Sequence, residues 1–311
     1  MKYKILEMLN TDEYVSGGEI SKKLGISRNA VWKHINALRK LGYEISSVPS
    51  RGYRLEKQQD IINPEVLKAH VPGKVYYYES ADSTNAVCKR TENVPDGSLF
   101  VSDTQTEGRG RLGRKWTSPK GCAVYMSLYL EPDIPVEKVS QLTLIAGMAV
   151  CRAIRSSRIK WPNDVLLNNK KICGILTEMT AEADRINHVI IGIGINVNNE
   201  LFTVELIEKA TSLYRETGTR YRRDKLICDI IDEFKELYVI YLKDGFSALK
   251  REYSLKCVTL NRQVIIVRNG AEFEARAVDI DANGGLVIEH DGVRETVTSG
   301  EVSVRGFLGY N

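Results

Sequence analysis

The segment from Gly108 to Trp116 constrains the fold of this chain more than any other stretch of its length. Its nine residues, GRGRLGRKW, place four cations among three glycines. Glycine lets the backbone adopt positive φ and approach a ligand closely. Arginine supplies planar, charged forks that fit carboxylates and phosphates. We therefore expect a loop between strands that folds around an anionic group.

Two other readings of this segment are less favourable. A disordered Gly/Arg tail is disfavoured because the run is short and lies mid-chain between strand-like segments. The run also matches G-x-G-x-x-G, in which the third glycine opens an apolar helix of a dinucleotide-binding fold. Here Gly113 is followed by RKWTSPKG, a poor helix start, so we do not expect that fold.

Length and cysteine usage restrict the class of protein. A chain of 311 residues suggests two or three domains. It has no apolar run of the ~18 residues that a membrane span requires and no secretory h-region. The six cysteines are scattered without a C-x-x-C pair, and the four histidines are isolated. We therefore expect a cytoplasmic protein with reduced thiols, no membrane partner and no protein-bound metal centre.

The positive charge is concentrated at the N-terminus. Residues 1–57 contain 11 Lys/Arg and 6 Asp/Glu, whereas the remainder contains 33 and 34. A basic module on a nearly neutral body suggests a nucleic-acid-binding domain.

Helix signals in this module predict a helix-turn-helix. Residues 2–9 have apolar residues on one helical face, and Ser16 to Glu19 has the spacing of a capping box. A turn at Gly25 to Ser27 precedes a longer helix that ends near Lys40, with Gly42 as its C-terminal glycine.

The second helix has a polar outer face, and a predicted hairpin over 45–48 and 52–55 follows it as a basic wing. Polar side chains on such a face can contact phosphates and base edges in a major groove. A small helical domain that binds protein is the alternative. The predicted DNA-binding residues are Ser27, Arg28, Asn29, Trp32, Lys33, Asn36 and Arg51.

Residues 75–257 alternate short strands with longer helices, which predicts an α+β domain with a largely antiparallel or mixed sheet. Strands are expected at 99–102, 123–130 (alternating), 159–161 and 188–197, and helices at 139–154 and 223–242. Asn168-Asn169 tolerates turn conformations, so we expect a hairpin joining 165–167 to 170–179.

Polar clusters interrupt these elements at Asp82 to Asn85, Gln105, Lys160 to Asp164, Lys171 and Asn196. Helix capping explains the first equally well, and strand termination explains Asn196. A lysine, a tryptophan and a Pro-Asn-Asp corner at a strand end exceed what a turn needs.

Short β runs separated by glycine turns begin at Arg262. The turns are Asn269-Gly270, Asn283 to Gly285 and Asp291-Gly292. Asn-Gly and Asp-Gly between alternating runs are strong hairpin signals. Four or five short strands predict a small barrel, with Arg305 after the last one.

Taken together, these motifs resemble the bifunctional biotin protein ligases and biotin operon repressors. The resemblance spans nearly the whole chain and depends on Gly108 to Trp116, on KWPND at 160–164 and on KICGIL at 171–176; ATSL at 210–213 is a weaker match. It implies a winged helix-turn-helix at 1–57, a linker at 58–64, a class II synthetase-like catalytic domain at 65–260 and an SH3-like domain at 261–311. Leu112 departs from the pattern, because some members have arginine there.

The resemblance also implies an activity. ATP and biotin are the substrates and Mg²⁺ assists; biotinyl-5′-AMP forms, and biotin then passes to a lysine of the biotin carboxyl carrier protein of acetyl-CoA carboxylase. Arg111, Lys171 and Asp164 are the expected catalytic residues. Biotin is expected to contact Ser83, Thr84, Asn85, Gln105, Arg109, Gly110, Arg111 and Lys171, and the nucleotide Arg114, Asn163, Lys171, Asn196 and Arg305.

By the same resemblance, the adenylate favours a homodimer that binds operator DNA. A biotin-sensing repressor without ligase activity and a lipoate or related acyl-protein ligase remain as alternatives.

Overall fold

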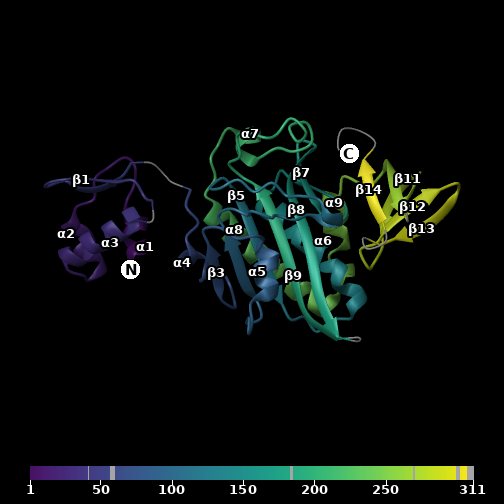
Figure 1. Cartoon of the computed structure of the whole chain (residues 1–311), viewed down its shortest axis with the longest axis horizontal. Helices are drawn as coiled ribbons and strands as arrows, with labels where there is room; N and C mark the ends of the chain where they lie inside the picture. The colour runs from purple at the N-terminus through teal and green to yellow at the C-terminus, as the bar shows by residue number, and fades with distance from the viewer. Residues whose placement is uncertain (41, 57–59, 183–184, 269, 299–301, 307–311) are drawn as a thin grey trace. The chain divides into compact units, whose positions relative to one another are not determined.

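The computed structural model describes residues 1–40, 42–56, 60–182, 185–268, 270–298 and 302–306 (Figure 1). The chain forms two compact units, Met1–Val66 and Leu67–Asn311. Within the described residues, no helix combines the length and apolarity that crossing a membrane requires.

The N-terminal unit contains three helices followed by a hairpin. The elements are α1 (Lys2–Met8), α2 (Gly17–Leu24), α3 (Arg28–Lys40), β1 (Ile45–Val48) and β2 (Gly52–Leu55). The Ser16 hydroxyl accepts from the Glu19 amide at 3.0 Å, and the Ser27 hydroxyl accepts from the Ala30 amide at 3.2 Å. These contacts satisfy amides that the first turns of α2 and α3 leave unpaired. The predicted helix-turn-helix layout is confirmed.

The inward face of α3 is apolar, as predicted. Val31, Ile35 and Leu38 are fully buried and pack in one cluster with residues of α1 and α2. The hairpin joins this unit through Gly52, whose φ is +111° and whose added Cβ would lie 2.1 Å from the Val15 carbonyl oxygen. A side chain at Gly52 would therefore separate the hairpin from the segment before α2.

A seven-stranded sheet in the order β3-β4-β5-β9-β8-β7-β6 forms the centre of the second unit. Neighbouring strands are antiparallel except β3 and β4, which confirms the predicted mixed sheet. The strands are β3 (Val75–Tyr78), β4 (Ser98–Ser102), β5 (Ala123–Leu130), β6 (Arg158–Lys160), β7 (Asp164–Leu167), β8 (Lys170–Glu182) and β9 (Arg185–Asn196).

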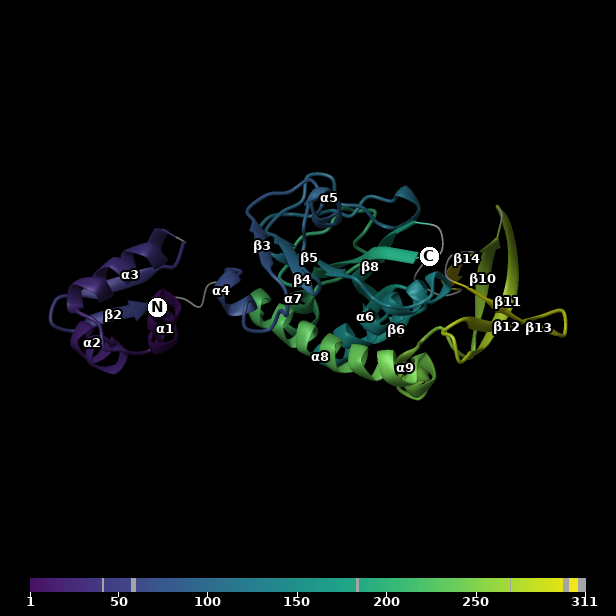
Figure 2. The ribbon, with the colours of Figure 1, turned by 90° about the horizontal axis from the view of Figure 1, so that it is seen from below.

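Helices cover this sheet on both faces. The longer ones, α6 (Val139–Ala153) and α8 (Arg223–Asp244), pack against each other, and α6 contacts β8 and β9. Figure 2 shows α8 and α9 on the side of the sheet opposite α5. Because both faces are covered, all eight residues of β5 are buried, although its sequence alternates. The remaining helices of the unit are α4 (Pro64–Leu67, at the unit boundary), α5 (Thr84–Arg90), α7 (Leu213–Thr217) and α9 (Lys250–Lys256), with 3₁₀ turns η1 (Arg111–Gly113), η2 (Val136–Lys138) and η3 (Phe246–Ala248).

The last five strands form an antiparallel sheet in the order β13-β12-β11-β10-β14. In the described residues, β13 and β14 are its edges. The strands are β10 (Arg262–Arg268), β11 (Ala271–Ile280), β12 (Leu286–His290), β13 (Val293–Val297) and β14 (Val302–Gly306). Asn269, in the first predicted glycine turn, lies outside the described residues.

The turn at Asn283 and Gly284 attaches this sheet to the central one. Trp161 Nε1 donates to the Gly284 carbonyl at 3.0 Å, and Gln141 Nε2 donates to the Asn283 carbonyl at 3.0 Å. Gly284 has φ +84°, and an added Cβ would lie 2.3 Å from Leu144. The KWPND corner is therefore fixed to the C-terminal strands.

Candidate active site

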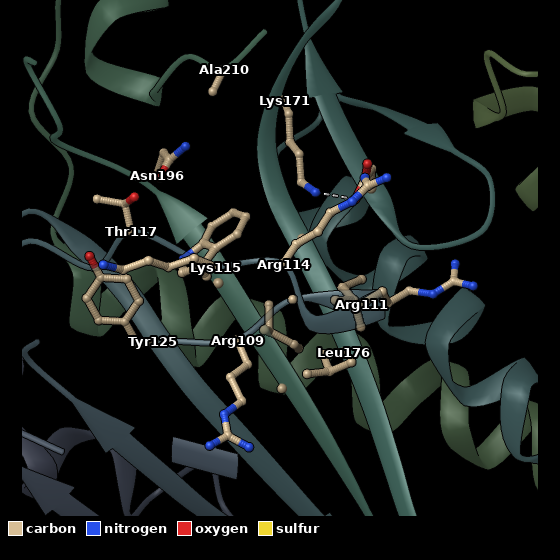
Figure 3. Close-up of a pocket in the computed structure, with 18 of the residues that line it drawn as sticks. Arg109, Arg111, Arg114, Lys115, Thr117, Tyr125, Lys171, Leu176, Asn196 and Ala210 are labelled. Carbon is tan, nitrogen blue, oxygen red and sulfur yellow. Dashed lines mark ion pairs between the residues drawn. The ribbon is translucent and has the colours of Figure 1, made fainter. Parts of the chain in front are cut away.

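A cavity of about 570 Å³ opens on the face of the central sheet that lies opposite α6 and α8 (Figure 3). Segments far apart in sequence line it: the start of α5, the Gly/Arg loop, the corner between β6 and β7, strands β8 and β9, and the segment after β9. All the predicted biotin-binding and catalytic residues line this cavity, as do Arg114, Asn163 and Asn196.

Glycines form the floor of the cavity. Gly174 of β8 pairs with Gly194 of β9, and Gly194 pairs with Tyr125 of β5. An added Cβ would lie 2.7 Å from the Trp116 indole at Gly194 and 2.9 Å from it at Gly174. Trp116 therefore rests on a patch of bare backbone.

The Gly/Arg loop forms a compact turn, as predicted. The Gly110 amide donates to the Arg114 carbonyl at 2.7 Å, and the Trp116 amide donates to the Gly108 carbonyl at 2.9 Å. An added Cβ on Gly108 would lie 2.4 Å from the Trp116 carbonyl oxygen. Arg114 follows η1 with extended backbone, so no helix starts at Gly113. This excludes the dinucleotide-binding geometry.

The arginines of the loop point in different directions. Arg111 donates to Asn163 Oδ1 at 3.1 Å, and burial lowers its pKa while nearby Asp164 raises it. Arg109 points away from Lys171 and lies 3.7 Å from Glu107 (Figure 3). Leu112 is 75% exposed, with φ +55°.

Two lysines and one carboxylate meet at the corner between β6 and β7. Lys171 Nζ lies 2.5 Å from Asp164 Oδ1 and 5.4 Å from the centre of the Trp116 ring. Lys160 pairs with Asp164 across the two strands and is only 7% exposed. Burial lowers the pKa of Lys160 to about 8; Asp164 opposes this shift, and Lys171 and Arg114 add to it. The corner therefore carries more cations than anions, which suits an anionic ligand.

A second polar group lies where α5 begins. Thr84 and Asn85 are buried, and the Ser127 hydroxyl lies within 2.7 Å of both side chains. Gln105 Oε1 accepts from the Thr84 amide at 2.9 Å. Ser83 has the N-cap position, but its side chain makes no capping bond. Capping therefore does not account for this cluster.

Sequence reasoning gave no role to three of the residues at this site. Lys160 and Trp116 are parts of the quoted motifs but were not assigned a function, and Ser127 belongs to an unremarkable strand. The side chain of Arg305, a predicted nucleotide contact, lies outside the described residues; its backbone pairs with Ile265 in the β10–β14 ladder.

In the N-terminal unit, the predicted DNA-binding residues share the outer face of α3 and the hairpin turn. Trp32 is 56% exposed, and Arg51 lies 4.8 Å from the centre of the Tyr14 ring. Asn36 is partly covered, because its Oδ1 accepts from Arg39. The other predicted positions, Ser27, Arg28, Asn29, Lys33 and Arg51, are exposed.

Family models match three parts of the chain. The HTH domain matches residues 2–54, the Biotin/lipoate A/B protein ligase family matches residues 77–196, and the Biotin protein ligase C terminal domain matches residues 259–305.

Known proteins match it along most of its length. The bifunctional ligase/repressor BirA of Bacillus subtilis is 42% identical over 299 residues, 91% of this chain and 92% of that protein. The Escherichia coli protein of the same name is 28% identical over 97% of this chain and 96% of its own length. A biotin protein ligase from Aquifex aeolicus, solved with biotin and ATP, matches with a TM-score of 0.67 and 31% identity, over 75% of this chain and 98% of that one. The chain therefore belongs to the biotin protein ligase family, in its group of bifunctional ligase/repressors.

Proposed function

We propose that this protein is an ATP-dependent biotin protein ligase that also represses biotin genes when biotinyl-AMP is bound. The observation that carries this proposal is a single cavity that joins a polar, buried cluster around Thr84 to the cations Arg111, Arg114 and Lys171. The first suits a neutral polar ring, and the second suits a carboxylate beside phosphates.

The reaction has two steps. A carboxylate oxygen of biotin attacks the α-phosphorus of ATP, the bond to the pyrophosphate oxygen breaks, and biotinyl-5′-AMP forms. The amine of an acceptor lysine then attacks the acyl carbon, AMP leaves with the electron pair of the acyl–oxygen bond, and the amine loses a proton as the amide forms. The acceptor belongs to the biotin carboxyl carrier protein.

The cations of the cavity offset the main obstacle to the first step, which is repulsion between the biotin carboxylate and the phosphates of ATP. Two unit anions at ~4 Å repel by about 4 kcal/mol at an effective dielectric of about 20. Lys171 lies close enough to the sheet floor to contact both the carboxylate and the α-phosphate, and Arg111 and Arg114 approach from the loop. Fixed cations of this kind stabilise charge as it develops in the transition state.

On the biotin side, Ser83, Thr84, Asn85 and Gln105 surround the ureido ring with the Arg109–Arg111 backbone. The buried polar atoms of the ring need partners, and this cluster offers both donors and acceptors.

On the nucleotide side, Asn163 and Asn196 face the cavity, and Arg305 is the third expected contact. Mg²⁺ commonly binds through substrate phosphates and one or two carboxylates. Asp164 and the oxygens of Asn163 and Asn196 are donors of the required type; the ion, when bound, screens the pyrophosphate charge.

Asp164 has a different role, in the transfer step. Its carboxylate, which lines the cavity, orients the incoming lysine ammonium and accepts its proton. Such proton transfer by a positioned side chain typically contributes 10²–10⁴-fold.

The repressor activity depends on the N-terminal unit. Residues 1–57 form a winged helix-turn-helix in which β1 and β2 are the wing; 58–64 are the linker, 65–260 the class II synthetase-like catalytic domain and 261–311 the SH3-like domain. The adenylate stabilises a homodimer that presents two such modules to operator DNA, because it binds the dimer-competent state more tightly. The free thiols support a cytoplasmic location.

One experiment separates the proposed ligase from its two rivals. The full chain is incubated with ATP, Mg²⁺, labelled biotin and a carrier domain. Label on the carrier supports the ligase, bound label without transfer supports a sensing repressor, and labelling by lipoate instead of biotin supports the related acyl ligase. Sedimentation with and without biotin and ATP then tests the dimer; an unchanged mass contradicts it.

A further inference from the structure

We propose that Glu178, an exposed residue outside the cavity lining, is a positioning residue for biotin recognition. It fixes the direction of a hydrogen-bond chain that leaves Thr84 as an acceptor for a ligand N–H group. This inference rests on the proposed biotin-binding function. The chain runs from Glu178 through Asn85, Ser127, Thr84, Gln105 and Ser118 to the Trp116 carbonyl.

One end of the chain is fixed by acceptors on β8. Asn85 Nδ2 donates to Glu178 Oε2 at 2.6 Å and to the Leu176 carbonyl at 3.3 Å. A carboxylate and a carbonyl only accept, so the Asn85 amide nitrogen must face them. Asn85 Oδ1 is then left facing Ser127 as an acceptor, at 2.6 Å.

The other end is fixed by the Gly/Arg loop. The Thr84 amide only donates, so the Gln105 atom 2.9 Å from it is Oε1, and Gln105 Nε2 donates to Ser118 Oγ at 3.0 Å. The Ser118 hydroxyl in turn donates to the Trp116 carbonyl at 3.1 Å. Between Thr84 and the Gly/Arg loop, each group therefore donates its hydrogen in the direction of the loop.

Thr84 lies between these two parts of the chain, in each of which the donors and acceptors are fixed. The Ser127 hydroxyl has one hydrogen, and Asn85 Oδ1 takes it. The Thr84 hydroxyl then has two acceptors within reach inside the protein, the Ser127 oxygen at 2.7 Å and Gln105 Oε1 at 3.3 Å. With its only hydrogen used inside the protein, Thr84 Oγ1 can offer only a lone pair to the cavity that it lines.

The central part of this chain is shielded from water, whereas Glu178 is exposed and Gln105 is half-buried. Ser127 is fully buried, Thr84 is 4% exposed and Asn85 is 6% exposed. Asn85 also rests on Gly192, where an added Cβ would lie 2.3 Å from its Oδ1. The Asn85 plane is therefore fixed by packing, and the choice between its two orientations depends on two acceptors, Glu178 at 2.6 Å and the Leu176 carbonyl at 3.3 Å from Nδ2.

Without Glu178, only the longer contact with the Leu176 carbonyl opposes rotation of the Asn85 amide, and the rotated amide nitrogen can donate to Ser127. Ser127 then donates to Thr84 and occupies one of its two lone pairs, so Thr84 Oγ1 becomes a weaker acceptor for the ligand N–H. We expect Glu178→Met to raise the Kd for biotin, measured calorimetrically on the full chain without nucleotide, about fivefold, as for one hydrogen bond. Glu178→Gln retains an acceptor and should bind as the native chain does, and Glu182→Met, on the exposed end of the same strand, is the matched control.

A double variant distinguishes direction from general weakening. If Glu178 acts through Ser127, then Glu178→Met adds little to the effect of Ser127→Ala, because both disrupt one chain. The Kd for ATP should stay unchanged in every variant. Native-like biotin binding by Glu178→Met, equal weakening by Glu178→Gln, or additive effects in the double variant overturns the inference. A native chain that binds no biotin contradicts the proposed function itself, so the two failures are distinguishable.

Discussion

Lys171 Nζ lies 2.5 Å from Asp164 Oδ1, so the proposed catalytic cation is paired with the proposed catalytic base. The pair is largely buried, with side chains 20% and 14% exposed. An arriving carboxylate and α-phosphate compete with Asp164 for Lys171. In the proposed mechanism, binding of these substrates releases Asp164 for the acceptor lysine of the second step.

Asp164→Asn should separate the two half-reactions. The amide cannot take a proton from the acceptor lysine, so we expect transfer to the carrier to fall by about 10²–10⁴-fold. Adenylate formation, measured by ATP–pyrophosphate exchange, should fall by a much smaller factor, because Lys171 and the arginines remain and only one oxygen donor for Mg²⁺ is changed. Asp133→Asn, on the surface, is the control. Equal losses in both half-reactions would show that Asp164 serves the first step as well.

Arg111→Gly should release the adenylate. The Arg111 side chain donates to Asn163 and joins the loop to the KWPND corner, so its loss leaves the loop free to open and admit water and stray amines. We expect biotinyl-AMP in solution and biotin on bystander lysines, both detected by mass spectrometry. Arg262→Gly, an exposed site on β10, controls for loss of charge. Unchanged leakage together with unchanged biotin affinity would remove this role from Arg111.

Gly194→Ala should weaken biotin binding without unfolding the protein. The new methyl group would lie 2.7 Å from the Trp116 indole, which must move and carry the Gly/Arg loop with it. We expect the Kd for biotin to rise at least tenfold, with a change in Trp116 fluorescence. Gly147→Ala, in the interior of α6 with 3.7 Å to the nearest side chain, should leave binding unchanged and stabilise the helix by about 1 kcal/mol. Equal biotin affinities for the two variants would mean that Trp116 does not shape the site.

Local signals in the sequence predicted much of the fold. The hairpin β1–β2 was predicted at its observed bounds, and the turn at Asn168 and Asn169, with φ of +49° and +64°, has the conformation that such residues tolerate. The Gly/Arg loop was predicted because its composition excludes a regular element. Each of these features depends on neighbours in sequence.

The features that the sequence did not predict depend on residues of neighbouring strands that pair across the sheet. Ser127 reaches Thr84 and Asn85 from β5, where it pairs with Gly192 of β9, and Glu178 reaches Asn85 from β8, the next strand beyond β9. The glycines of β9 were noticed, but they become a floor only when Gly194 pairs with Gly174. Strand order and register carry this information, and no short motif contains it.

ATP binding should weaken as pH rises through about 8. Burial lowers the pKa of Lys160 to about 8 from 10.5, so the amine is charged below this pH and becomes neutral above it. Lys160 lines the same cavity as the cations proposed to hold the phosphates. Loss of its charge should therefore reduce the affinity for an anion, and the KM for ATP should rise between pH 7.5 and 9. Lys160→Met should show a higher KM throughout and no rise in this range, with circular dichroism as the check on folding. A pH dependence that persists in Lys160→Met would assign it to another group.

DNA binding should distinguish two arginines that both lie 4.8 Å from the centre of the Tyr14 ring. Arg54 also donates to both oxygens of Glu56 at 3.0 Å, whereas Arg51 is exposed at the hairpin turn. An arginine whose charge is matched within the protein releases few counterions on binding, so only Arg51 should contribute to the salt dependence of affinity. In titrations of operator DNA over a range of salt concentrations, Arg51→Ala should reduce the slope of log K against log salt by about 1. Arg54→Ala should leave the slope nearly unchanged. If both variants keep the native slope, the hairpin turn does not contact the phosphates.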